Sequence, residues 1–82
     1  MYKLSFKSSV VKDLKRLDKT EIKNILGKID ERILPNPLDG KPLHGEFRGC
    51  YRRRFGDYRV IYTVVGTEVL VLRIENRKDV YL

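Results

Sequence analysis

The architecture of the chain is set by residues 50–74, CYRRRFGDYRVIYTVVGTEVLVLRI, in which runs of aromatic and β-branched residues are separated by short polar breaks. Gly56-Asp57 and Gly66-Thr67 are two-residue breaks with glycine first, a pattern typical of tight hairpin turns. Strands joined by such turns pair in an antiparallel manner. The stretch therefore predicts a meander of three strands, at Cys50–Phe55, Tyr58–Val65 and Glu68–Ile74.

Upstream of this meander, the sequence predicts one more strand and two helices. Residues 2–7 alternate apolar and polar side chains, as in a half-buried strand. Residues 9–34 show a helical spacing of apolar residues, and Asp18 and Glu21 have the spacing of a capping box at the start of the second helix. Prolines end that helix, and residues 35–49 are predicted to form an ordered loop.

The predicted order of elements is β-α-α-β-β-β, which is an α+β fold. We expect a mainly antiparallel four-stranded sheet, because the first strand must join the meander to bury its own apolar side chains. The two helices form a hairpin packed on one face, and the other face stays at least partly open. A chain of 82 residues with one core of this size is a single domain, residues 1–82. The open face is the natural place for a functional site.

Composition narrows the possible classes of function. The 18 Lys and Arg residues outnumber the 11 Asp and Glu residues, and the formal net charge of +7 favours a polyanion or an acidic protein as partner. The sequence has no apolar run long enough to span a membrane and no apolar signal segment, so we expect a cytoplasmic protein without a membrane partner. A single Cys and a single His exclude a four-ligand Cys/His zinc site.

The two kinds of basic residue are separated along the chain. Eight of the nine lysines lie in residues 1–41, and seven of the nine arginines lie in residues 42–82. Arginine carries a planar guanidinium group that binds phosphate through two parallel hydrogen bonds and stacks on bases. An arginine-rich half could also simply keep a small domain soluble. Three consecutive arginines, with two more near the C-terminus, favour a phosphate-binding surface instead.

Strand alternation assigns these arginines to the two faces of the sheet. With the aromatic residues of the first meander strand on the core side, Arg52 and Arg54 point to the open face, and Arg59 of the next strand joins them. Arg53 has core parity, so we expect it to reach past the sheet edge to solvent, or its strand to be an edge. Acidic residues could neutralise the cluster, and the candidates are Glu46, Asp57 and Glu75.

Several stretches of the chain resemble the RelE/ParE superfamily of bacterial and archaeal toxins, and more narrowly its RelE branch. They are the Leu43-His44-Gly45 loop, the basic strand after Tyr51, GDYRVIY at residues 56–62 and RKDVY at residues 77–81. The resemblance implies the toxin of a type II toxin–antitoxin system, an endoribonuclease that enters the ribosomal A site and cuts mRNA. It implies attack of the ribose 2′-hydroxyl on the adjacent phosphate, without a metal or another cofactor.

The functional positions of the family correspond to basic and aromatic residues of this chain. Those expected to act in catalysis are Arg52, Arg54, Arg59, Arg77 and Tyr81, and those expected to contact RNA are His44, Arg48, Arg53 and Lys78. The best-known members carry lysines where this chain has Arg52 and Arg54. Arginine keeps its proton near neutral pH, so these two residues can clamp the phosphate but cannot act as general base. Four candidates for the general base remain: Tyr81, Lys78, His44 and a ribosomal group. Of these we favour Tyr81.

The resemblance also implies partners. An acidic antitoxin would wrap the toxin and cover its basic face, giving a hetero-oligomer, whereas the toxin alone is expected to be a monomer that meets the ribosome and mRNA. Two alternatives stay open. One is a ParE-like inhibitor of DNA gyrase on the same fold, and the other is a non-catalytic domain that binds nucleic acid or an antitoxin.

Overall fold

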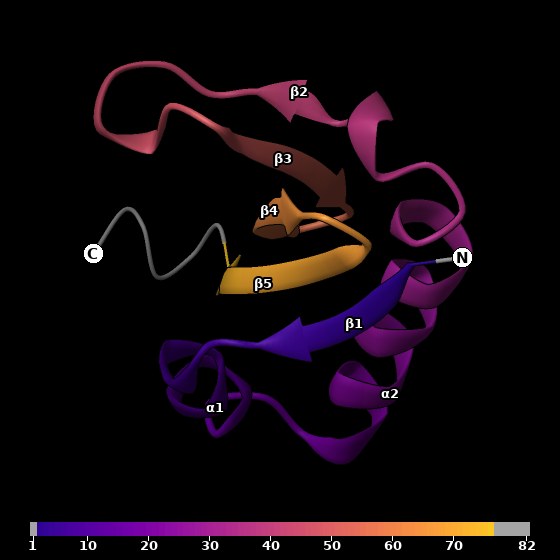
Figure 1. Ribbon diagram of the computed structural model, residues 1–82. Coiled ribbons are helices and arrows are strands. Elements are labelled where there is room, and N and C mark those ends of the chain that lie inside the picture. Colours follow the sequence, from indigo (N-terminus) through magenta and orange to yellow (C-terminus); the bar gives the residue numbers. More distant parts are fainter. Residues whose placement is uncertain (1, 77–82) are drawn as a thin grey trace.

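The computed structural model describes residues 2–76 as a five-stranded sheet with two α-helices (Figure 1). The strands lie in the order β1-β5-β4-β3-β2. β1 pairs parallel with β5, and all other neighbours in the sheet are antiparallel. The strands are β1 (Lys3–Phe6), β2 (Lys41–Pro42), β3 (Cys50–Phe55), β4 (Tyr58–Val65) and β5 (Glu68–Asn76).

The α+β fold and the antiparallel meander are confirmed, and the number of strands is corrected from four to five. The additional strand, β2, lies in the segment predicted as a loop, where Lys41 is opposite Arg52 and Pro42 is opposite Tyr51. A strand of two residues leaves no alternation in the sequence, so its pairing could not be read from the pattern. Both predicted hairpin turns are present, each with its glycine at positive φ.

The helices are shorter than the predicted hairpin. α1 spans Ser8–Leu14, and α2 spans Lys19–Lys28 and continues as a π-helical turn over Ile29–Ile33. The predicted capping box is confirmed, because Asp18 accepts a bond from the Glu21 backbone N–H at 2.8 Å and the Glu21 side chain accepts one from the Asp18 N–H. The start of α2 is therefore fixed locally. None of the helices in residues 2–76 has the length and apolar character needed to cross a membrane.

The hydrophobic core lies between the helices and one face of the sheet. In Figure 1, α2 runs past the strands from β1 toward β2, and α1 lies beside β1 and β5. The buried residues of the core are Val10, Ile25, Ile29, Ile33, Val60, Tyr62, Val69, Val71 and Ile74. Burial of a large apolar side chain contributes about 1.5–3 kcal/mol, so this cluster provides most of the driving force for folding. Because both α-helices of residues 2–76 pack on this face, the opposite face of the meander carries none of them, and we call it the helix-free face.

A β-bulge interrupts the pairing of β4 with β5. Ile61 pairs with Arg73, but the next residue, Tyr62, pairs with Val71. Leu72 is therefore an extra residue between two regular parts of the ladder. The extra residue shifts the alternation of side chains along β5 by one position.

The bulge determines which side chains in the second half of β5 point to the core and which point to the opposite face of the sheet. Val71 before it and Ile74 after it are both buried, at 0% and 4% exposed, although they are three positions apart. Unbroken alternation from Val71 would have turned Arg73 and Glu75 into the core. Ser9 of α1 stabilises the distortion by donating its hydroxyl to the carbonyl of the extra residue at 2.7 Å. Helix α1 and the bulge together therefore turn two charged side chains to the helix-free face.

Tyr62 ties the segment before β2 to the core. Its side chain is fully buried, and its hydroxyl donates to the Pro37 carbonyl at 2.6 Å. Gly40 leaves room for this hydroxyl, since a Cβ at that position would overlap it. The ring of Tyr51 stacks on Tyr62 with 5.6 Å between the centroids. Burial raises the pKa of Tyr62 from 10.0 to about 12, because the phenolate would lose its hydration.

Replacing Tyr62 by Phe is expected to lower the free energy of unfolding by about 1–3 kcal/mol at neutral pH, since the Pro37 carbonyl loses its donor. The pKa of Tyr62 is higher in the folded state than in the unfolded chain, so its contribution is fully present below pH 10 and is lost as the pH rises through 12. The wild-type advantage should therefore shrink between pH 10 and pH 12. Urea titrations of both proteins measure it, and a constant difference up to pH 12 would contradict the prediction.

Candidate functional site

Three of the predicted arginines, Arg52, Arg54 and Arg59, share one face of the sheet, and we call them the arginine face. Arg54 lies directly opposite Arg59, and Arg52 lies opposite Ile61, two positions along. Residues paired directly across an antiparallel ladder point to the same side. Ile61 is only 8% exposed here, as expected where long arginine stems flank an apolar side chain. Within residues 2–76, Arg52 and Arg54 form no ion pair, so both can receive an anion.

Arg59 is held by a carboxylate from β5. Glu75 lies opposite Arg59 in the β4–β5 pairing, and its Oε1 accepts a bond from Arg59 Nε at 3.1 Å and lies 3.0 Å from Nη2. The two side chains are 28% and 20% exposed. Of the three acids suggested by the sequence as neutralising partners, Glu75 is the one that the described residues pair with the arginine face. The carboxylate fixes the orientation of the Arg59 guanidinium.

A second arginine–carboxylate pair lies beside the arginine face, and the sequence analysis did not predict it. Arg73, opposite Ile61, donates from Nε and Nη2 to Asp13 at 3.0 and 3.1 Å. The Ile74 backbone N–H also donates to Asp13 at 2.9 Å. The hydrogen bonds that the Arg73 guanidinium donates to the Asp13 carboxylate raise the pKa of Arg73. The only sequence signal was the position of Asp13 three residues after Val10, on the buried side of α1.

A hollow of about 170 Å³ opens next to these two pairs. Its lining includes Asp13 and Arg16 from α1 and the residues after it, and Arg73 and Glu75 from β5. Glu75 therefore both contacts the arginine face and lines the hollow. Charged groups of both signs suit a polar ligand that carries hydroxyl and phosphate groups.

Arg53 lies on the other face of the sheet, opposite Val60. Its guanidinium is 3.8 Å from Asp39 and 5.8 Å from the ring centroid of Phe55. The side chain is 27% exposed, so it reaches the surface despite its core parity. A second hollow, of about 510 Å³, is lined by Arg53, Arg54, Lys28, Arg32, Phe55 and Tyr58, among others. Basic residues therefore gather on both sides of the sheet.

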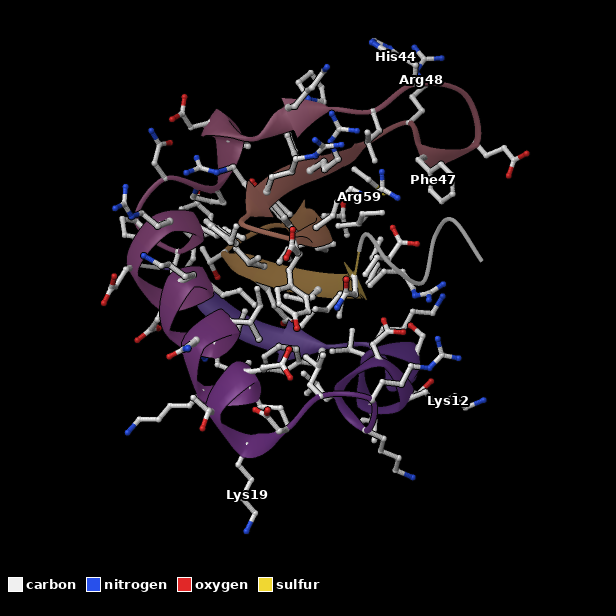
Figure 2. All side chains as sticks on the ribbon, turned by 180° about the vertical axis from the view of Figure 1, so that it is seen from behind. Lys12, Lys19, His44, Phe47, Arg48 and Arg59 are labelled. Carbon is white, nitrogen blue, oxygen red and sulfur yellow. The ribbon has the colours of Figure 1, made fainter. Side chains whose placement is uncertain are left out.

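Two residues predicted to contact RNA, His44 and Arg48, do not join the arginine face. His44 and Arg48 are exposed on the segment between β2 and β3. Figure 2 shows them at the tip of that segment, away from Arg59. Three further predicted residues lie outside the described residues, and their roles stay predictions: Arg77, Lys78 and Tyr81.

A small α+β domain with a basic, helix-free sheet face is the kind of protein that binds an acidic macromolecule or one that carries phosphate groups. The family model described as the ParE toxin of the type II toxin–antitoxin system, parDE, matches residues 4–81 of this chain. The chain belongs to this toxin family, and its resemblance to the RelE/ParE superfamily is confirmed.

Similar proteins of known name or structure are toxins of the same kind. The chain is 30% identical over 83 residues to Toxin RelG of Mycobacterium tuberculosis, with 98% of this chain and 95% of that protein covered. Among solved structures, it is similar to the toxin–antitoxin complex RelBE2 of Mycobacterium tuberculosis, with a TM-score of 0.86, 29% identity, and coverage of 93% of this chain and 91% of that chain. The RelB–RelE antitoxin–toxin complex of Methanococcus jannaschii gives a TM-score of 0.68, 30% identity and 94% coverage of both chains. The chain is therefore a toxin of a type II toxin–antitoxin system.

Proposed function

We propose that this toxin is a ribosome-dependent endoribonuclease that cuts mRNA in the ribosomal A site. The observation that supports the proposal is the register of β3 and β4, which brings Arg52, Arg54 and Arg59 together on the helix-free face. Guanidinium groups held at such a face stabilise the negative charge that develops on phosphate oxygens during phosphoryl transfer. The resemblance to the RelE branch supplies the reaction and the ribosomal setting, and with it a cytoplasmic site of action.

In the proposed reaction, the ribose 2′-oxygen attacks the adjacent phosphorus, the bond from the 2′-oxygen to phosphorus forms, and the bond to the 5′-oxygen breaks. The products are a 2′,3′-cyclic phosphate and a free 5′-hydroxyl, so no water is consumed. Arg52 and Arg54, which have no ion pair within residues 2–76, bind the non-bridging oxygens. Arg59, oriented by Glu75, completes the clamp. The resemblance alone adds Arg77 and Tyr81 to this site.

We also propose that an acidic antitoxin is the partner of this chain. The similar structures from Mycobacterium tuberculosis and Methanococcus jannaschii are complexes of a toxin with an antitoxin. The arginine face and the basic hollow beside α2 present positive charge on both sides of the sheet. An acidic chain wrapped around the sheet would neutralise both surfaces and keep RNA away from the arginine face.

Purified toxin, added to a translation extract that contains one defined mRNA, is expected to produce new 5′ ends within codons in the ribosomal A site. Mapping of these ends by primer extension measures the cleavage, and a variant with Arg77→Ala and Tyr81→Phe is expected to leave the mRNA intact. Intact mRNA with the wild-type protein would overturn the proposal. A supercoiling assay with purified DNA gyrase tests the alternative of a ParE-like gyrase inhibitor, which the description of the family suggests. Binding of mRNA without cleavage would favour the non-catalytic alternative.

A further inference from the structure

The proposed reaction needs a group that accepts the proton of the 2′-hydroxyl, and the arginine face does not contain one. Arginine holds its proton at all physiological pH values. The sequence suggested three side chains, of which Lys78 and Tyr81 lie outside the described residues. The third, His44, lies on the segment between β2 and β3, away from Arg59 in Figure 2. Among residues 2–76, a candidate base is therefore sought in the side chains that the fold brings to the arginine face.

Glu75 is the carboxylate that the described residues bring to this face. Its Oε1 lies 3.1 Å from Arg59 Nε and 3.0 Å from Arg59 Nη2. The side chain is 20% exposed, which leaves it accessible to a ligand. Because Arg59 neutralises the carboxylate, a negatively charged phosphate can approach without strong repulsion.

The hollow beside Glu75 provides space for the sugar that carries the attacking hydroxyl. Its volume is about 170 Å³, and charged side chains line it. Glu75 contacts Arg59, which lies opposite Arg54, and it also lines the hollow. The carboxylate is therefore next to both a phosphate-binding arginine and the space proposed for the sugar.

We propose that the Glu75 carboxylate is the general base of the RNA-cleavage reaction, an inference that rests on the proposed function. Glu75 takes the proton of the 2′-hydroxyl as the bond between the 2′-oxygen and phosphorus forms. The departing 5′-oxygen keeps the electron pair of its broken bond to phosphorus and receives a proton from water. The protonated carboxyl then returns its proton to solvent. Arg54 and Arg59 stabilise the charge on the phosphorane oxygens throughout.

Replacement of Glu75 by Gln tests this role with little change in shape. The Gln carbonyl oxygen can still accept bonds from Arg59, but the amide cannot accept a proton in the reaction. General bases contribute about 10²–10⁴-fold to rate, so Glu75→Gln is expected to slow single-turnover cleavage in programmed ribosomes at least about 100-fold. Glu68→Gln is the matched control, since this residue lies at the other end of β5, is exposed and binds Ser5 instead of an arginine.

The conservative variant Glu75→Asp distinguishes a base from a residue that only positions Arg59. Gln keeps an oxygen that accepts bonds from Arg59 but loses the group that accepts the proton, whereas Asp keeps a carboxylate. Glu75→Asp should therefore recover part of the rate that Glu75→Gln loses, because a carboxylate with shorter reach is present again.

Each outcome of these assays is decisive. A Glu75→Gln variant that is slow, unfolds at the wild-type temperature and still binds programmed ribosomes, together with partial recovery of the rate in Glu75→Asp, would support the inference. Wild-type cleavage rates in Glu75→Gln would overturn it and leave the proposed function standing. Faster cleavage would also overturn it, since Glu75 would then restrain Arg59 instead of assisting it. If the wild-type toxin leaves the mRNA intact, the proposed function fails first and the role of Glu75 with it.

Discussion

A double variant with Arg52→Ala and Arg54→Ala should cut mRNA about 10³-fold more slowly than the wild type, or not detectably, in programmed ribosomes. Loss of one preorganised donor to a developing oxyanion costs about 10²–10³-fold, and this variant removes two. Neither arginine has an ion pair within residues 2–76, so their removal leaves no carboxylate of these residues unpaired, and we expect the variant to fold. Rates of appearance of the new 5′ ends measure the effect.

A second double variant, Lys12→Ala with Lys19→Ala, controls for net charge. It also removes two positive charges, and Figure 2 shows both lysines on the helices, away from Arg59. We expect it to cut at close to the wild-type rate, because general attraction to RNA depends on charge but the clamp depends on position. Equal losses in the two double variants would mean that the arginine face contributes only charge. Arg52→Lys with Arg54→Lys should keep much of the activity, since lysine is common at these positions in the family.

The Asp13→Ala variant is expected to lower the free energy of unfolding by about 3 kcal/mol, the largest effect that we expect on stability. Asp13 is 9% exposed and accepts bonds from the Arg73 guanidinium and from the Ile74 backbone N–H. Removing it leaves a buried N–H without an acceptor next to the β-bulge. Because domains of this size are stable by only about 5–15 kcal/mol, a large part of the protein should unfold at temperatures that the wild type withstands.

Asp30→Ala is the matched control for this variant, because Asp30 is an exposed acid in the π-helical turn. Its effect should stay within about 0.5 kcal/mol, as for most surface substitutions. Urea titrations of both variants measure the difference, and equal stabilities would show that the Asp13 bonds contribute nothing net. At temperatures where Asp13→Ala is folded, slower mRNA cleavage would indicate that the bulge also positions Glu75.

Much of the candidate site could be predicted from the sequence because β3 and β4 alternate regularly. The tight turn at Gly56 fixes which residues face one another, and alternation then places Arg52, Arg54 and Arg59 on one side. Arg53 followed the same rule, and its core parity took it to the opposite face. These placements depend only on neighbours in sequence, so they needed no knowledge of tertiary contacts.

The residues that alternation could not place are those after the bulge in β5. Unbroken alternation along β5 would make Arg73 and Glu75 core residues. In the structure both side chains point instead to the helix-free face, on which the arginine face lies. The bulge contacts α1, since Ser9 donates to the carbonyl of the extra residue and Asp13 accepts from the backbone N–H of Ile74. No local signal in β5 records those contacts, since the partners are about 60 residues away in sequence.

The amino-acid sequence by itself determined the order of the elements other than β2, the meander with its two glycine turns, the capping box of α2 and the faces of the β3 and β4 arginines, because each depends on spacing over a few residues. Only the tertiary structure decided the pairing of β2, the bulge in β5 and the contact of Glu75 with Arg59, because each requires segments distant in the chain to meet. Spacing over a few residues reflects local backbone preferences. The face to which a side chain points after a bulge is determined instead by the packing around that bulge.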